Sequence, residues 1–404
     1  MSFLLAKLNS SVSFRSLSAI FTIQQQVLNK TIKYPSYQTG LLWVKKLGYY
    51  QLYLQKEVSD DWIIIADESI GIGQEKLFVI LGIRKSEVNF SRPLKLQDLK
   101  PLLVKSKESW KGDDIAKELK SLETKLGKIL YAVTDAGNAL RKGLRLSGIT
   151  HIYDITHSIA IVLERIYKNN PDFKSYTSQM GQMRLKLCSS KYAHLIPPNQ
   201  RSKSRFLNID IVSNWGIKVL KALQKNNLNN EEKNLLLWVK EKQDFIVEMD
   251  TIIEAVRKIS AELKKNGLSK KSRKICISFL TDFKKGRLKI FRNHMIKYFE
   301  DNTKIIKKYR EKLLCTSDII ESTFGRYKNE INKNPMSGIT DLALIIPAFT
   351  SDFSEESITK AIDFCSVKKL KEWNKTNLCE SLTKKRNKVF PRIMNENKKI
   401  KLLI

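Results

Sequence analysis

The amino-acid sequence predicts an α/β protein in which a mixed β-sheet with flanking helices is interrupted by a large all-α insertion. Between residues 61 and 170, short β-branched runs alternate with helical patterns, an order typical of a sheet with crossover helices. From residue 171 to about residue 315, strand patterns give way to apolar residues at helical spacing on segments with basic faces. A helical region precedes the sheet, and a basic region follows it.

The N-terminal region is predicted to form three short helices. The stretches LLAKL, SLSAIFTIQQQVL and TGLLWVKKLGYY have helical spacing, and Pro35 introduces a turn before the third. Residues 1–60 carry 7 basic and 2 acidic groups. Two interpretations fit equally well: a DNA-binding region of the helix-turn-helix kind, or a helical collar packed on the next domain.

The predicted sheet begins with a β-hairpin. WIIIADES and KLFVILGI are dense β-branched or apolar runs, and the turn residues GIGQ put the loop between Ile70 and Glu75. A third strand is predicted within PLLVKS. The GIGQEK segment lacks the G-x-x-x-x-G-K-[ST] spacing and lies in a hairpin, which excludes a nucleotide-binding loop and a nucleotide cofactor.

Helices and strands alternate after the hairpin. DDIAKELKSLETKLG is predicted as a helix capped by Asp113 or Asp114 and ended by Gly127. KILYAVTDAG is predicted as a buried strand ending at Asp135, followed by the short helix NALRKGLRLSG. THIYDITH is a strand running into a turn, and SIAIVLERIYKNN is the next helix.

These patterns divide the chain into five parts. They are a helical N-terminal region (1–58), the first part of the core (59–170), the basic helical insertion (171–314), the last helix of the core (315–350) and a basic C-terminal region (351–404).

The charge is strongly positive and unevenly distributed. The chain has 73 Lys and Arg against 41 Asp and Glu, a net charge of +32 with a pI near 9.8. Residues 171–315 hold 32 basic and 14 acidic groups, and residues 366–404 hold 12 and 3. The stretches 61–170 and 316–365 together carry no net charge. A neutral core with basic arms is typical of an enzyme that binds a polyanion such as DNA.

The cysteines and the N-terminus bear on the cellular compartment. No C-x-x-C pair occurs, which argues against a zinc ribbon and a disulfide framework and favours a reducing compartment. The N-terminus lacks the apolar core of a signal peptide, and no stretch resembles a membrane span. We therefore expect a cytoplasmic, nucleoid-associated protein with no membrane partner. The five cysteines are Cys188, Cys276, Cys315, Cys365 and Cys379.

Three carboxylates occupy positions suited to metal binding. Asp67 and Asp135 end predicted strands, and Glu321 lies one turn into the helix after the insertion. Phosphoryl transfer with two metals needs carboxylates around two hard cations about 4 Å apart. Each residue also has a structural interpretation: Asp67 as the start of a turn, Asp135 as an N-cap, and Glu321 with Asp318 as a capping box.

Four motifs occur in order over about residues 60–330: ADESIGIGQEK, VTDAGNALRKG, YDITH and SDIIESTFGRYK. As a set they resemble the motifs of the DDE transposases with a ribonuclease-H-like catalytic domain. The resemblance is to the Mutator/hAT-like group of bacterial insertion-sequence type, which has a C/D-x-x-H element and a helical insertion before the last Glu. It implies that Asp67, Asp135 and Glu321 bind two Mg²⁺ (or Mn²⁺) ions and catalyse the reaction. Asp154 and His157 would shape the site or contact DNA. Because Asp154 also ends a strand, it is a rival to Asp135 as the second ligand.

Further residues are candidates for DNA contact. Trp215 and Trp238 are either core residues or platforms on which an unpaired base stacks. His157 is either a structural histidine at a helix start or a contact to the scissile strand, and only three other histidines occur (His151, His194 and His294), which argues against a His-rich metal site. Basic side chains of the insertion either face solvent or bind phosphates, and they are Lys271, Arg273, Lys274, Lys284, Lys285 and Arg287.

The function that we expect is that of a DNA transposase. It would hydrolyse element ends and transfer the 3′-hydroxyl into target DNA, with the terminal repeats and target as double-stranded partners. The resemblance implies a homodimer on DNA, because two ends must be brought together. Two alternatives stay open: a non-catalytic transposase relict that binds DNA as a regulator, and a structure-specific nuclease of the same fold.

Overall fold

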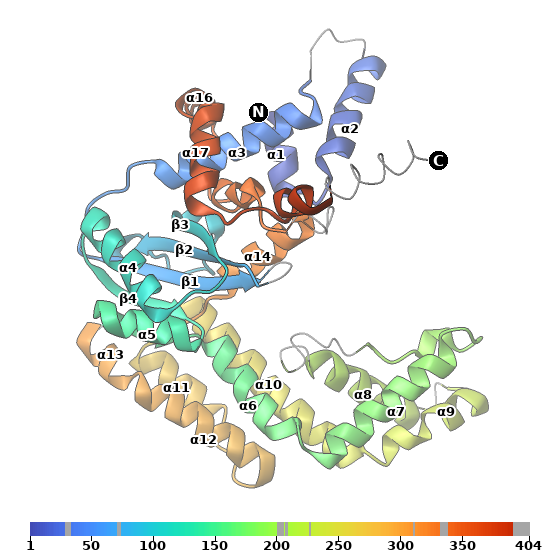
Figure 1. Ribbon diagram of the computed structural model, residues 1–404. Coiled ribbons are helices and arrows are strands. Elements are labelled where there is room, and N and C mark those ends of the chain that lie inside the picture. Colours follow the sequence, from blue (N-terminus) through green and yellow to red (C-terminus); the bar gives the residue numbers. More distant parts are fainter. Residues whose placement is uncertain are drawn as a thin grey trace. The chain divides into compact units, whose positions relative to one another are not determined.

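The computed structural model forms two compact units, described here separately. The sheet unit comprises residues 1–89, 94–152 and those from 317 onward, and the helical unit comprises residues 90–93 and 153–316. Figure 1 shows the elements of both. The residues that the structure describes are 1–28, 34–70, 74–199, 206, 209–225, 228–309, 312–331 and 338–390.

A mixed five-stranded sheet with the order β3-β2-β1-β4-β5 forms the centre of the sheet unit. Strands β1 and β2 form the predicted hairpin, β3 adds to it in antiparallel direction, and β4 runs parallel to β1. This order confirms the predicted mixed sheet. The strands are β1 (Trp62–Ile70), β2 (Lys76–Arg84), β3 (Lys100–Lys107), β4 (Ile129–Thr134) and β5 (Thr150–Tyr153). Two short 3-10 helices, η1 (Lys85–Glu87) and η2 (Leu96–Asp98), lie between β2 and β3.

One face of β1 contributes to a hydrophobic core covered by helices α4 (Gly112–Leu126) and α5 (Asn138–Ser147). Side chains alternate along a strand, so Trp62, Ile64 and Ala66 enter this core. In α4 the apolar residues recur every three or four positions and meet the same core. The other residues of β1, which include Asp67, face away from it. On that opposite face Ile63 and Ile65 are also buried, so Asp67 follows two buried apolar residues on its own face of the strand.

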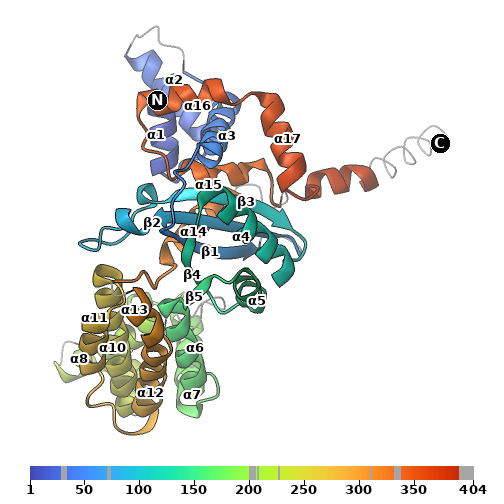
Figure 2. The same cartoon turned by 90° about the vertical axis from the view of Figure 1, so that its left-hand side faces the viewer.

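The N-terminal residues form three helices, as predicted: α1 (Ser2–Asn9), α2 (Phe14–Val27) and α3 (Tyr37–Tyr53). Ser13 and Ser36 cap the second and third by accepting a hydrogen bond from the backbone N–H three residues on. Helix α3 packs against β3 and lies beside α16 (Glu355–Phe364) (Figure 2). The N-terminal region therefore packs as a helical collar. Binding of DNA by this region stays a prediction.

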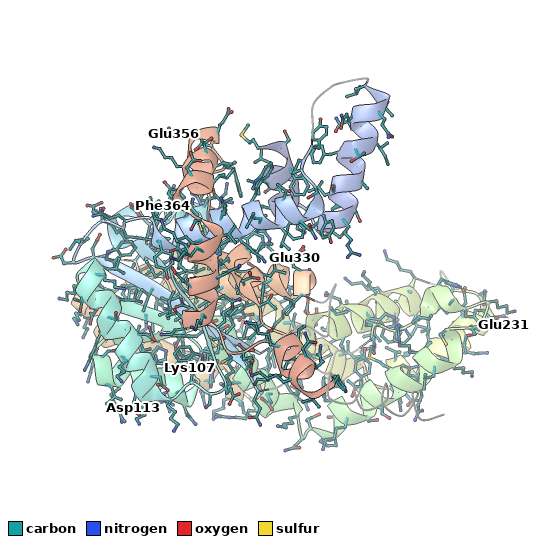
Figure 3. All side chains as sticks on the ribbon, turned by 45° about the horizontal axis from the view of Figure 1, so that its top comes forward. Lys107, Asp113, Glu231, Glu330, Glu356 and Phe364 are labelled. Carbon is teal, nitrogen blue, oxygen red and sulfur yellow. The ribbon has the colours of Figure 1, made fainter. Side chains whose placement is uncertain are left out.

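The C-terminal part of the sheet unit is also helical. It contains α14 (Asp318–Ile331), η4 (Asp341–Leu344), α15 (Ile345–Ala348), α16 and α17 (Val367–Asn377). Helix α14 packs against β1, and its Glu330, labelled in Figure 3, forms an ion pair of 2.7 Å with Lys7 of α1. Arg326 of α14 donates to the backbone oxygen of Leu8 and stacks over the ring of Phe349. Helix α1 is therefore tied directly to α14.

The helical unit is built from α6 (Ile155–Tyr167), α7 (Pro171–Leu187), α8 (Ile209–Gln224), α9 (Asn230–Lys240), α10 (Gln243–Asn266), α11 (Lys270–Ser278), α12 (Gly286–Asp301) and α13 (Thr303–Tyr309), with the short 3-10 helix η3 (Ala193–Leu195). Helix α10 packs on α8, α11, α12 and α6. The all-α insertion of the predicted fold is thus confirmed.

The compact boundary of the helical unit differs from the predicted boundary at residue 171, since the unit begins at Tyr153. The reason is that helix α6 packs against α12 and α10 of this unit. Its buried residues include Ile159, Val162 and Ile166. Among the described residues, no helix combines the length and apolar character that a membrane span requires.

Candidate functional site

Asp67 lies within strand β1 and not at a turn. It pairs with Val79 of β2, and the strand continues to Ile70. The side chain is half-buried, and its Oδ1 accepts a hydrogen bond of 2.7 Å from the backbone N–H of Glu68. The interpretation of Asp67 as the start of a turn is therefore wrong, because antiparallel pairing holds the backbone extended on both sides of it.

Asp135 follows β4 immediately and is also half-buried. Its Oδ1 accepts a hydrogen bond of 2.9 Å from the backbone N–H of Gly137, which closes a tight turn between the strand and α5. The N-cap position of α5 is Gly137, and no side chain caps that helix. The interpretation of Asp135 as an N-cap is thus wrong, since its carboxylate shapes the turn that precedes the helix.

The pairing of β1 with β4 relates the two aspartates. The parallel register pairs Ile63 with Tyr131 and Ile65 with Val133. The ladder ends at this last pair. If the same register were continued by two residues, Asp135 would lie beside Asp67, and the period of two would give both side chains the same face. Neighbouring strands lie about 4.8 Å apart, a spacing that lets two carboxylates bind one cation between them.

Glu321 lies in the first turn of α14, which begins at Asp318. The backbone oxygen of Ser317 accepts a hydrogen bond of 2.9 Å from the N–H of Ile320 at this end of the helix. Asp318 is therefore a helical residue and not the cap that the capping-box interpretation requires. Because α14 packs against β1, the strand that carries Asp67 contacts the helix that carries Glu321.

A histidine that sequence reasoning left unassigned supports the turn at Asp135. The hydroxyl of Thr134 donates to the backbone oxygen of Asp135 at 2.8 Å and lies 2.9 Å from Nε2 of His151 on β5. Because the hydroxyl has one proton, which goes to Asp135, we infer that Nε2 of His151 donates to it. Burial and the charge of Arg141 lower the pKa of His151. Only the pairing of β4 and β5 brings these residues together.

Asp154 and His157 form a pair within the helical unit. Asp154 is fully buried and caps α6, accepting a hydrogen bond of 2.8 Å from the backbone N–H of Thr156. Its other carboxylate oxygen lies 3.0 Å from Nδ1 of His157. The choice between Asp135 and Asp154 as the second ligand stays a prediction, because each carboxylate accepts a backbone hydrogen bond through one oxygen. Each of Asp154, His157 and Glu321 offers a ligand atom of a kind that divalent cations accept.

The two candidate tryptophans lie together in the helical unit. The rings of Trp215 on α8 and Trp238 on α9 are 6.1 Å apart with 30° between their planes, and Tyr176 packs near Trp238 at 5.8 Å. Both tryptophans are half-buried. Each therefore contributes to packing and also presents part of its surface to solvent, so base stacking by one of them stays a prediction.

The candidate basic residues differ in how they are engaged. Lys271 and Lys274 on α11 and Lys284 and Lys285 before α12 are exposed. Arg273 donates to the hydroxyl of Thr303 at 3.0 Å.

Arg287 is more strongly bound within the helical unit. It pairs with Glu248 and with Asp172, the latter at 3.3 Å, and stacks over Phe245. Its charge is balanced by these two carboxylates, so it serves the packing of α12 against α10 and α7. Contact of all six basic residues with DNA stays a prediction, and the four exposed lysines are the best placed for it.

Comparison with known proteins gives little beyond the geometry. No family model matches the chain, and no curated protein matches it. Among solved structures 15 chains match, and one is described as "Drosophila P element transposase strand transfer complex". The similarity to that chain extends over 86% of this chain and 92% of that one, with 12% identity and a TM-score of 0.44. A likeness of this size is weak, and it leaves the function to be inferred from the residues themselves.

Proposed function

We propose that this protein is a DNA transposase of the DDE type, in which Asp67, Asp135 and Glu321 hold two divalent ions, Mg²⁺ or Mn²⁺. The observation that carries the proposal is the parallel register of β1 and β4, which supports a pair of neighbouring carboxylates at Asp67 and Asp135. The packing of α14 against β1 supports Glu321 as the third. The donor set consists of carboxylate oxygens, which hard cations prefer.

The state of Asp135 fits a metal ligand. Gly137 engages Oδ1, and within the described residues Oδ2 of Asp135 accepts no hydrogen bond. One oxygen therefore fixes the side chain while the other is left for a cation. When bound, two such ions activate the attacking oxygen and steady the leaving oxygen of a phosphodiester. The chain itself supplies the positioning: the sheet holds Asp67, the turn holds Asp135, and α14 holds Glu321.

The proposed reaction has two steps on DNA. Water hydrolyses the phosphodiester at an element end and releases a 3′-hydroxyl, which then attacks a phosphodiester of target DNA. The positive charge of the insertion, 32 basic against 14 acidic groups over residues 171–315, supports binding to DNA phosphates without sequence preference. Joining two element ends would require two copies of the chain, so we propose a homodimer on DNA.

The proposal is tested with the purified protein, Mg²⁺ or Mn²⁺ and the DNA that flanks its gene. Asp67→Asn, Asp135→Asn and Glu321→Gln should each abolish strand cleavage and leave DNA binding largely intact. Glu68→Gln is the matched control, because Glu68 neighbours Asp67 on the opposite face of β1 and pairs with Lys76 at 2.7 Å. Normal metal-dependent cleavage by any of the three variants would show that its residue is wrongly assigned.

The same assay separates the alternatives. Wild-type protein that binds these ends without cutting them, in either metal, would favour the non-catalytic regulator. Protein that cuts without joining would favour the structure-specific nuclease, which a strand-transfer assay with labelled target DNA detects.

A further inference from the structure

The sheet unit contains a cavity of about 450 Å³ at the other end of the strands from Asp67. The cavity is lined by residues at the ends of three strands: Trp62 at the start of β1, Arg84 at the end of β2 and Lys100 at the start of β3. Residues that follow α3 also line it. From Trp62 to Asp67 is five residues of strand, or roughly 16 Å. The cavity is therefore distinct from the carboxylate site, and its size is typical of a small-ligand site.

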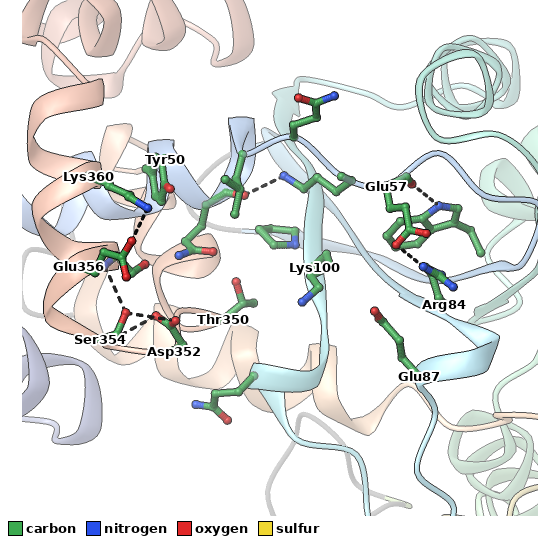
Figure 4. A pocket seen from close by; sticks show the side chains of 18 residues that line it. Tyr50, Glu57, Arg84, Glu87, Lys100, Thr350, Asp352, Ser354, Glu356 and Lys360 are labelled. Carbon is green, nitrogen blue, oxygen red and sulfur yellow. Dashed lines mark hydrogen bonds and ion pairs between the residues drawn. The ribbon is translucent and has the colours of Figure 1, made fainter.

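The cations of this cavity are of two kinds. Arg84 pairs with Glu57, and Lys360 pairs with Glu356 at 2.5 Å, so both are neutralised by partners in the wall (Figure 4). Within the described part of the chain, neither Lys56 nor Lys100 forms an ion pair.

The ammonium group of Lys56 donates to two backbone oxygens at the end of α3, those of Gln51 at 2.8 Å and Leu52 at 2.7 Å. These bonds occupy two of its three protons and hold the group in place. Lys100 lies between the Thr350 side and the Arg84 side of the cavity (Figure 4). Burial, and after it the charge of Lys100, lowers the pKa of Lys56 to about 7. Two cations that form no ion pair in the described part of the chain therefore repel each other in this cavity.

The remaining lining suits an oxyanion. Gln55, Gln97 and Ser357 add side-chain donors to the wall. Asp352 already accepts from the backbone N–H and the hydroxyl of Ser354, each at 3.2 Å. Of the other three carboxylates of the lining, Glu57 and Glu356 are paired with Arg84 and Lys360, and Glu87 is exposed to solvent.

We propose that this cavity binds a phosphate group between Lys56 and Lys100. A tetrahedral dianion cancels the repulsion of the two ammonium groups and accepts hydrogen bonds from several directions, which a carboxylate does less well. The group comes either from free phosphate or from a DNA backbone, and both present the same chemistry to the lysines. The site does not depend on the proposed carboxylate centre, with which it shares no residue.

The test follows the reactivity of the Lys56 amine in the full-length protein. An amine-acetylating ester near neutral pH should label Lys56 much faster than Lys360, because the lowered pKa of Lys56 leaves more of its amine uncharged there. Inorganic phosphate should slow the labelling of Lys56 by about tenfold, since a bound dianion favours the charged amine. Mass spectrometry of peptides gives both rates in one sample.

Lys100→Gln is the diagnostic variant, because Lys100 is exposed and its loss should not unfold the protein. It should abolish protection of Lys56 by phosphate. Lys360→Gln, in the same wall, should retain it, and Glu87→Gln should strengthen it. A DNA duplex is the second probe: protection by duplex alone identifies a DNA backbone as the source, and protection by inorganic phosphate alone identifies the free ion.

Three results would overturn the inference. They are protection no better than that of sodium chloride or acetate at equal ionic strength, full protection in Lys100→Gln, and labelling of Lys56 no faster than that of Lys360.

Discussion

Ile65 of β1 and Val133 of β4 are paired in parallel register, and each is followed two residues later by an aspartate. If Asp67 and Asp135 share a cation, Mn²⁺ should stabilise the folded protein, because the ion binds the native state only. At a concentration about 100 times the dissociation constant the gain is about 2.7 kcal/mol. Thermal unfolding with and without Mn²⁺ should show a rise in Tm that Asp67→Asn and Asp135→Asn each lose.

Glu68→Gln serves as the control for this measurement, since it removes one carboxylate from the same strand but from the other face. It should keep the full response to Mn²⁺. An equal loss in Glu68→Gln would mean that the ion responds to overall charge and not to a site at Asp67.

The contact between Thr134 and His151 should influence metal affinity without either residue binding the ion. The Thr134 hydroxyl joins the backbone of Asp135 to His151, so it fixes the turn from which the carboxylate projects. Residues that orient a ligand commonly contribute about 10- to 100-fold in metal affinity. Thr134→Val and His151→Phe should therefore weaken Mn²⁺ binding by this range in a calorimetric titration.

His151→Gln should recover part of the affinity, because its side-chain amide can still donate to the hydroxyl. His294→Gln is the matched control, since His294 is another partly buried histidine bonded to a hydroxyl, that of Ser158, but it belongs to the helical unit. Unchanged affinity in His151→Phe with wild-type Tm would refute the positioning role.

The strands could be predicted from the sequence because their signal is local. Runs such as WIIIADES and KLFVILGI are rich in β-branched and aromatic residues, and the turn chemistry between them predicts a hairpin. The three carboxylates could be singled out for the same reason, because Asp67 lies in one of these runs, Asp135 follows a strand and Glu321 lies in the first turn of a helix. Nothing local distinguishes the functional reading of Asp67 or Asp135 from the structural one.

The contacts that distinguish a functional from a structural role join residues far apart in the sequence. The register of β4 on β1, the contact of Thr134 with His151 and the ion pair of Lys7 with Glu330 all join segments far apart in the chain. The place of α6 depends on α12 and α10, whose packing surfaces become complementary only in three dimensions. Periodicity indicates that a helix has an apolar face but not which neighbour covers it.

Asp154 should behave as a helix cap. It accepts from the N–H of Thr156 and pairs with His157, so Asp154→Ala should destabilise the protein by about 1–2 kcal/mol, measured by urea unfolding. Asp154→Asn retains an oxygen for the Thr156 N–H and should cost less.

The capping role of Asp154 also separates it from Asp135. Asn170→Ala removes the cap of α7, which accepts from Phe173 N–H at 2.9 Å, and gives the cost of losing an ordinary cap for comparison. Asp154→Asn should keep the Tm rise with Mn²⁺ that Asp135→Asn loses. The reverse pattern would exchange the roles of the two aspartates.

Lys56 should make stability depend on pH in a defined window. Its pKa is about 7 in the folded state against 10.5 for the unperturbed group, so between these values the unfolded state binds the additional proton. Stability then rises with pH across the window, and the unfavourable contribution is greatest below the folded pKa. Lys56→Met keeps the apolar stem and removes the titration, so its free energy of unfolding should rise less between about pH 7 and about pH 9.5.

Lys360→Met provides the control for this pH dependence, since Lys360 is exposed and its pKa is raised by the hydrogen bond and charge of Glu356. Its curve should run parallel to that of the wild type over the same window. A Lys56→Met curve that is also parallel would show that the folded protein keeps Lys56 charged.

The ion pair of Lys7 with Glu330 should be costly to break and inexpensive to replace. Lys7 is 1% exposed and Glu330 is 8% exposed, and the ammonium also donates to the backbone oxygen of Val12 at 2.6 Å. Lys7→Met removes one partner of this buried ion pair and should destabilise the protein by about 3–5 kcal/mol. The double variant Lys7→Met with Glu330→Leu removes both charges and should recover most of that loss. Urea unfolding of Lys7→Met, of Glu330→Leu and of the double variant gives the coupling energy between the two side chains directly. A double variant as unstable as Lys7→Met would mean that the loss comes from the hydrogen bond to Val12 and not from the ion pair with Glu330 of α14.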